Sequence, residues 1–156
     1  MRKIRKKTKK PRAPWNKVQI KEERTLMNTY GLQRKKELRS AEAILRNFRQ
    51  RARALIGEKN EEKEKLLLDK LSKLGLVKGT KDLDNVLALQ VTDILNRRLQ
   101  TILKNKGLAK TPKQSRQMIT HGHIVIDDRR IVFPSYLVPL EEENKIAFQE
   151  NSKMRK

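Results

Sequence analysis

An apolar stripe with helical spacing dominates the first half of the chain. Its members recur at intervals of three and four residues, and they are Leu38, Ala41, Leu45, Phe48, Ala52 and Leu55. This spacing places apolar side chains on one face of an α-helix, so we expect a helical region from Thr25 to residue 90. Within it, residues 58–74 predict a further helix with acidic residues early, lysines later and a narrow leucine stripe that ends before Gly75.

The next two helices are predicted to lie close together. One begins near Leu89 or Val91 and runs to Lys106, and its apolar face is made of Val91, Ile94, Leu95, Leu99, Ile102 and Leu103. The other begins at Thr111, which can cap a helix, with Pro112 at the first helical position and Gln114 placed for the reciprocal bond of a capping box. We expect this helix to end at Gly122.

After these helices the apolar period changes to two. Alternation predicts a β-hairpin around Asp127-Asp128, with an apolar face made of Ile124, Ile126, Ile131 and Phe133. Tyr136-Leu137-Val138 predicts another short strand. The fold class is therefore expected to be α+β and predominantly helical, with two helices packed against a small sheet near the C-terminus.

Charge changes this picture, because the chain carries 39 basic and 18 acidic residues and a net charge of +21. Residues 1–54 hold 19 of the basic residues and 4 of the acidic ones, while residues 86–140 hold 9 and 3. A chain with so much charge of one sign repels itself and needs a polyanionic partner. Nucleic acid is the favoured partner. A membrane surface is disfavoured, because the basic helix lacks the bulky aromatic and leucine-rich face that membrane-surface helices use.

The first 24 residues predict a basic, extended arm. This segment has almost nothing apolar to bury, so we expect it to order only against phosphates. The alternative is a disordered solubilising or nuclear-targeting tail. Trp15 beside two prolines would serve as a stacking group or an anchor. The candidate RNA-binding residues of the arm are Arg2, Lys3, Arg5, Lys6, Lys7, Lys9, Lys10, Arg12 and Trp15.

Further candidate RNA contacts lie on the predicted helices. The arginines beside the first apolar stripe lack balancing acids, and the exposed N-terminus of a helix attracts anions. These candidates are Arg39, Arg46, Arg49, Arg53, Arg97, Arg98, Gln100, Lys104, Lys110, Thr111, Lys113, Gln114, Arg116, Gln117 and His121. For the two glutamines, a surface position without contact remains an equal alternative. We further predict that the double variant Arg98→Glu, Arg116→Glu keeps its fold and binds RNA more weakly.

Several kinds of chemistry are disfavoured by the residues present. The chain has no cysteine, which excludes disulfides and cysteine-based zinc sites. His121 and His123 lack the further ligands of a metal site, and Asp127 and Asp128 are typical of a turn. We expect no enzyme activity, no cofactor, no metal and no small-molecule substrate. No apolar run approaches the roughly 18 residues of a membrane span, so a cytosolic protein is expected.

One run of about 41 residues has the pattern of a known RNA-binding module. It includes Arg98-Leu99-Gln100-Thr101, Gly107-Leu108-Ala109-Lys110-Thr111, Ser115-Arg116-Gln117-Met118-Ile119, His121-Gly122-His123-Ile124-Val125-Ile126-Asp127 and Pro134-Ser135-Tyr136-Leu137-Val138. This run resembles the S-four module, which implies two helices and a β-turn that present a basic surface to structured RNA. The family often has Asn-Gly at the hairpin turn, where this chain has Asp127-Asp128.

The rest of the chain narrows the resemblance. Pro14-Trp15, the helical region and the run that begins at Arg97 are similar to the archaeal and eukaryotic branch of the small-subunit ribosomal protein S-four family. The resemblance implies a primary binder of small-subunit ribosomal RNA, in the cytoplasmic ribosome, that nucleates assembly and affects decoding accuracy. It also implies an S-five-type neighbour. The cysteine cluster of many bacterial members is absent, so their zinc site cannot be carried over.

These observations predict four segments and leave two alternatives to the ribosomal interpretation. The segments are an arm at 1–24, a helical region at 25–90, the RNA-binding module at 91–140 and a charged tail at 141–156. One alternative is a nucleolar assembly factor that binds a small nucleolar RNA. The other is an RNA-modifying enzyme with an accessory module, for which the chain has too little length.

Overall fold

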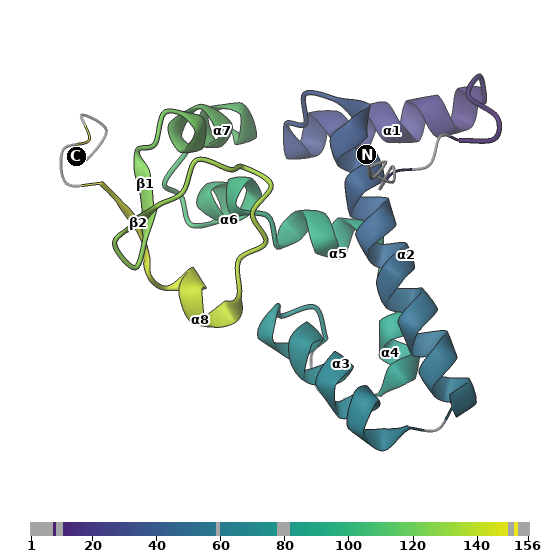
Figure 1. Ribbon diagram of the computed structural model, residues 1–156. Coiled ribbons are helices and arrows are strands. Elements are labelled where there is room, and N and C mark those ends of the chain that lie inside the picture. The colour runs from purple at the N-terminus through teal and green to yellow at the C-terminus, as the bar shows by residue number, and fades with distance from the viewer. Residues whose placement is uncertain (1–7, 9–10, 59, 78–81, 150–151, 153–156) are drawn as a thin grey trace, which may run out of the picture.

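The computed structural model describes residues 8, 11–58, 60–77, 82–149 and 152, and it has two lobes (Figure 1). The helical lobe contains α1 (Lys17–Tyr30), α2 (Lys35–Glu58), α3 (Glu61–Lys73), α4 (Leu83–Ala88) and α5 (Val91–Asn96). The C-terminal lobe contains α6 (Leu99–Asn105), α7 (Pro112–Thr120), β1 (Ile124–Ile126), β2 (Arg129–Arg130), α8 (Leu140–Glu143) and β3 (Ile146–Phe148). Each lobe has its own hydrophobic cluster. The expected α+β class is confirmed.

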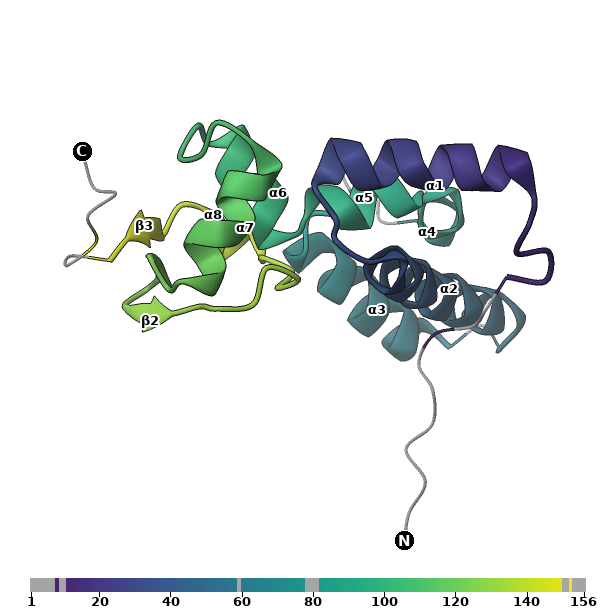
Figure 2. The same ribbon diagram turned by 90° about the horizontal axis from the view of Figure 1, so that it is seen from above.

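The long helix α2 is the backbone of the helical lobe. All six residues of its predicted stripe are buried, and α1, α3, α4 and α5 pack around it (Figure 2). Helix α3 also follows the expectation, because Leu67 and Leu71 are buried and the helix ends just before Gly75. Burial of apolar area at roughly 25 cal/mol per Å² is what holds these helices together. In the described part of the chain, no helix is both long enough and apolar enough to cross a membrane.

The expected boundary of the arm at residue 24 is wrong, because α1 already begins at Lys17. The side chain of Asn16 caps it and accepts a hydrogen bond from the backbone N–H of Val18 at 3.0 Å. Further along α1, Glu23 is buried and its carboxylate lies 2.7 Å from Nζ of Lys35. The helix is therefore held by its cap and by an ion pair with the start of α2.

The single helix expected from about residue 90 to 106 is divided into α5 and α6. Between them Arg98 has an extended backbone with φ −74° and ψ 140°. The N–H of Leu99 donates to the carbonyl of Tyr136 at 2.8 Å, and the N–H of Val138 donates to the carbonyl of Arg97 at 3.0 Å. A helix cannot make such a strand-like exchange, so the helix breaks where the chain pairs with residues 136–138. The strand expected at Tyr136–Val138 is accordingly a single bridge, between Arg98 and Leu137.

The sheet has the order β2-β1-β3 with antiparallel pairs. Asp127 and Asp128 form the predicted hairpin turn with φ of 50° and 66°, the positive values that a two-residue turn of this hand requires. Two expectations were wrong here. Phe133 is 68% exposed because β2 ends at Arg130, and the segment 141–156 is more than a tail because it supplies α8 and β3.

Candidate RNA-binding surface

The arginines of α2 differ in exposure. Arg46 and Arg53 are exposed, whereas Arg39 and Arg49 are half-buried. The guanidinium of Arg49 donates a hydrogen bond to the carbonyl oxygen of Leu89, which ties α2 to the chain that follows α4. Arg46 and Arg53 can thus meet an anion in solution, while Arg49 makes a contact within the lobe.

The N-terminus of α7 has the cap that the sequence predicts. Oγ1 of Thr111 accepts from the N–H of Gln114 at 3.2 Å, and Oε1 of Gln114 accepts from the N–H of Lys110 at 2.9 Å. The expected cap is confirmed, but its second bond goes to Lys110 and not to Thr111. Lys110 and Lys113 are exposed beside this partly positive helix end. The other exposed candidates of this lobe are Lys104, Gln117 and His121.

Two candidates of the C-terminal lobe are paired with a carboxylate of the helical lobe. Oε2 of Glu37, in the first turn of α2, lies 2.7 Å from Nη2 of Arg98 and 3.0 Å from Nη1 of Arg116. The side chains are 5% exposed for Arg98 and 18% exposed for Arg116. These guanidinium groups pair with Glu37 within the protein, which leaves them poorly placed for phosphate.

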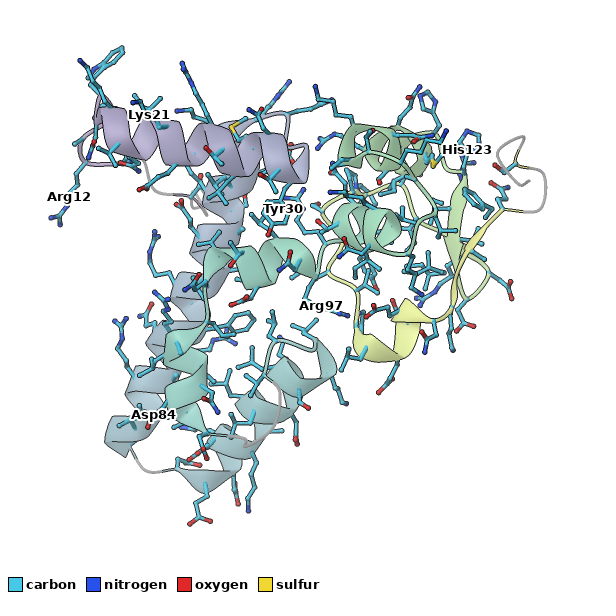
Figure 3. All side chains as sticks on the ribbon, turned by 180° about the vertical axis from the view of Figure 1, so that it is seen from behind. Arg12, Lys21, Tyr30, Asp84, Arg97 and His123 are labelled. Carbon is cyan, nitrogen blue, oxygen red and sulfur yellow. The ribbon has the colours of Figure 1, made fainter. Side chains whose placement is uncertain are left out.

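Gln100 and Arg97 also make contacts within the protein. Gln100 is 1% exposed, and its Nε2 lies 2.9–3.2 Å from the carbonyl oxygens of Tyr30, Gly31 and Pro112. Arg97 donates to the carboxylate of Glu143 at 2.8 Å and to the carbonyl of Val138 at 2.7 Å. Tyr30 and Arg97 both lie in the region between the lobes (Figure 3). Buried Gln100 therefore links the end of α1 to the start of α7 by hydrogen bonds and is not exposed to RNA.

The pKa of Glu37 reflects this environment. Burial raises it, but hydrogen bonds and positive charge from Arg116 and Arg98 outweigh the burial, and the net pKa lies below its ordinary value. By contrast, burial and the nearby charge of Glu23 raise the pKa of Glu42 on the same helix. The ionised form of Glu37 is thus favoured by folding.

A pH dependence of stability follows from the lowered pKa of Glu37. A depressed carboxyl pKa contributes stability that is fully present above the unfolded-state value of about 4.3. It is lost as the pH falls through the lower folded-state pKa. We expect Glu37→Gln to reduce the urea midpoint at pH 7, and the difference from the parent to shrink as the pH falls below about 4.3. A difference that stays constant from pH 7 to pH 3 would contradict this assignment.

Of the candidate residues of the arm, Arg12 and Trp15 lie among the described residues. Arg12 and Trp15 are exposed, and Trp15 is 87% exposed just before α1 (Figure 3 labels Arg12). The candidates Arg2, Lys3, Arg5, Lys6, Lys7, Lys9 and Lys10 lie outside the described residues. The exposed indole agrees with a role as a stacking group or anchor, and that role stays a prediction.

Helix α1 carries basic residues that the sequence analysis did not select. Lys17, Lys21 and Arg24 are exposed at spacings of four and three residues, which would have identified them if the helix had been extended back to Asn16. Helices α1 and α7 lie along the same edge of the molecule, with α3 at the opposite edge (Figure 1). The C-terminal end of α1 meets the N-terminal end of α7, where an added Cβ at Gly31 would lie 2.7 Å from Cβ of Pro112. The basic side chains of both helices can therefore face one extended ligand.

The histidines make local contacts. The rings of His121 and His123 lie 6.3 Å apart, and Nδ1 of His123 is 3.1 Å from Oγ of Ser152. Among the described residues, no group of three or more His, Cys, Asp or Glu side chains is arranged to hold a metal ion.

Comparison with known proteins decides the family. The S4 domain model, which corresponds to the S-four module above, matches residues 97–144. The small ribosomal subunit protein uS4 of Ignicoccus hospitalis is 47% identical over 154 residues, which cover 97% of this chain and 93% of the relative. The uS4 proteins of Methanothermobacter thermautotrophicus and Methanococcus aeolicus are 45% and 49% identical, over 99% and 92% of this chain and 92% and 84% of the relatives. The chain belongs to the uS4 family of small ribosomal subunit proteins.

Membership of the uS4 family confirms the resemblance to its archaeal branch. The matched S4 domain begins at Arg97, where α5 and α6 separate, and ends just after α8. The relatives are named as ribosomal proteins, in agreement with the expectation of a non-enzymatic protein. The lobe boundary in the structure thus coincides with the start of the S4 domain of this uS4 chain.

Proposed function

We propose that this chain is a structural component of the small ribosomal subunit and binds ribosomal RNA without catalysis. The observation that carries the proposal is 47% identity to a uS4 protein over 97% of the chain. The supporting geometry is the line of exposed basic residues on α1 and around the start of α7. Phosphate contacts would supply most of the affinity, and the shape of folded RNA would supply the choice of site.

More specific roles rest on the family resemblance. We propose that the chain is a primary binder at a multi-helix junction of the small-subunit RNA, and that its binding nucleates assembly. We also propose an S-five-type protein neighbour and an effect on decoding accuracy in the cytoplasmic ribosome. The basic arm would order along the RNA surface, which suits its composition.

The double variant Lys110→Glu, Lys113→Glu tests the RNA-binding surface. We expect its affinity for a junction-containing fragment of small-subunit ribosomal RNA to fall by about 100-fold in filter binding at fixed salt. The log–log salt slope should become shallower by about 1.4 to 1.8, because two phosphate contacts are lost. Glutamate is favourable near a helix N-terminus, so the change should not unfold α7.

The matched control is Lys65→Glu, Lys70→Glu on α3, where both lysines are exposed on the opposite edge. It changes the net charge equally and should weaken binding far less. Equal losses in both double variants would show that only total charge matters, and would reject the surface proposed here.

The nucleolar alternative makes a different prediction about complexes in the cell. A structural component sediments with mature small subunits at one copy per subunit, whereas an assembly factor is absent from them. Sucrose-gradient sedimentation followed by quantitative mass spectrometry distinguishes the two. Absence from mature subunits would reject the proposed function.

A further inference from the structure

One carboxylate of the helical lobe pairs with two arginines of the C-terminal lobe. Glu37 comes from the first turn of α2, while Arg98 precedes α6 and Arg116 lies in the middle of α7. One oxygen of Glu37 accepts hydrogen bonds from both arginines, at 2.7 Å and 3.0 Å. One carboxylate oxygen of the helical lobe thereby binds side chains from both helices of the S4 domain, in addition to the hydrogen bonds of Gln100 to Tyr30 and Gly31.

The ion pairs of Glu37 favour one angle between the two lobes. The lobes have separate hydrophobic clusters, and the apolar contact between them is small, with Leu137 of the C-terminal lobe packed against the helical cluster. Charge-assisted hydrogen bonds do have preferred directions and are about twice as strong as neutral ones. The side chain of Glu37 is only 19% exposed, so water screens its two ion pairs weakly.

The same contact lies beside the candidate RNA surface. Arg116 is one turn from Lys113, and Gln100 bonds both to the end of α1 and to Pro112 at the start of α7. A change in the angle between the lobes would therefore move the basic residues of α1 away from those of α7. Preorganised surfaces bind more tightly, because less ordering remains to be done on binding.

We propose that Glu37 is a positioning residue that locks the S4 domain onto the helical lobe and so aligns the two basic helices for RNA, a role that rests on the proposed function. Glu37 does not itself touch RNA. It sets the angle at which α7 and α1 meet the RNA, by holding Arg98 and Arg116 together.

A second interpretation of the same contact gives the opposite result in a binding experiment. If Glu37 only masked two arginines from phosphate, Glu37→Gln would release them. Affinity would then rise, and the salt slope would steepen by about 0.7 to 0.9 for each new phosphate contact. Under our proposal the affinity falls and the slope does not steepen.

The experiment combines RNA binding with a distance measurement. The chain has no cysteine, so a single pair of spin labels can be placed at Asn47→Cys on α2 and Asn144→Cys beside α8, both exposed. We expect Glu37→Gln to broaden the distance distribution in double electron–electron resonance, and to lower affinity for the junction RNA fragment by about 10-fold. The control Glu62→Gln on α3 changes the charge equally at an exposed site and should change neither measurement.

Each outcome bears on the proposal. An unchanged distance distribution, or an affinity that is unchanged or higher, overturns it. If Glu37→Gln fails to fold by circular dichroism, Arg116→Gln takes its place, since it keeps the shorter pair of Glu37 with Arg98 and should broaden the distribution partly. Failure of the parent protein to bind ribosomal RNA would reject the proposed function, while the distance measurement would still test the lock.

Discussion

The double variant Arg98→Glu, Arg116→Glu is expected to unfold the protein. Both arginines pair with Glu37, and Arg98 is 4% exposed, so the change would gather three carboxylates in a half-buried space. Removing one partner of a buried ion pair typically costs about 3 to 5 kcal/mol. Added repulsion brings the loss above about 5 kcal/mol, which is comparable with the whole stability of many domains.

The measurement is urea unfolding followed by circular dichroism, with Lys104→Glu, Lys113→Glu as the matched control. Both control lysines are exposed, and the pair produces the same change in net charge. The control should unfold near the parent midpoint. Coincident unfolding curves for the two double variants would contradict the role of the Glu37 pairs. The sequence alone predicted that this double variant keeps its fold. The ion pairs with Glu37 lead to the opposite prediction.

Alanine at Gly31 is expected to cost about 3 kcal/mol of unfolding free energy. Gly31 has φ +62°, and its new Cβ would lie 2.7 Å from Cβ of Pro112 and 3.2 Å from its backbone carbonyl carbon. The left-handed backbone accounts for about 1 to 2 kcal/mol, and the forced contact accounts for the rest. Because Pro112 starts α7, the cost falls on the contact between the lobes.

Gly107→Ala separates the two contributions. Gly107 has a similar φ of +74°, but an added Cβ there meets nothing within 4 Å. We expect a loss of only about 1 to 2 kcal/mol, from the backbone alone. Urea midpoints of the two variants give the difference directly. Equal losses would mean that Pro112 moves away without cost, and that the lobes are not closely fitted at this point.

The sequence predicted the elements that depend on residues close to one another in the chain. The α2 stripe was correct because a helix in contact with a core must bury every third or fourth residue, and all six members are buried. Thr111 and Pro112 located the start of α7 for a similar reason, since a cap acts within one turn. The aspartate turn was located by the change of period on either side of it.

The elements that depend on contacts between residues far apart in the sequence were not predicted. The break at Arg98 depends on pairing with Leu137, and β1 meets β3 only after some 20 intervening residues. The same holds for the site, because Glu37 is separated from Arg98 by 61 residues and from Arg116 by 79. A positive charge in a basic sequence looks available for phosphate until the fold brings a carboxylate to it. Among the described side chains, Lys110 and Lys113 are exposed without a carboxylate partner and remain the better candidates.

The strand order β2-β1-β3 has a consequence for synthesis of the chain. The central strand β1 is made before β3, so one of its two edges has no pairing partner until Ile146–Phe148 has left the ribosome. An open strand edge is a template for joining another chain. A product truncated after Glu143 would keep the helices and the hairpin but expose that edge permanently. A chain that ends between Glu143 and Ile146 should therefore aggregate. A chain that ends after Phe148 should fold with both edges of β1 paired.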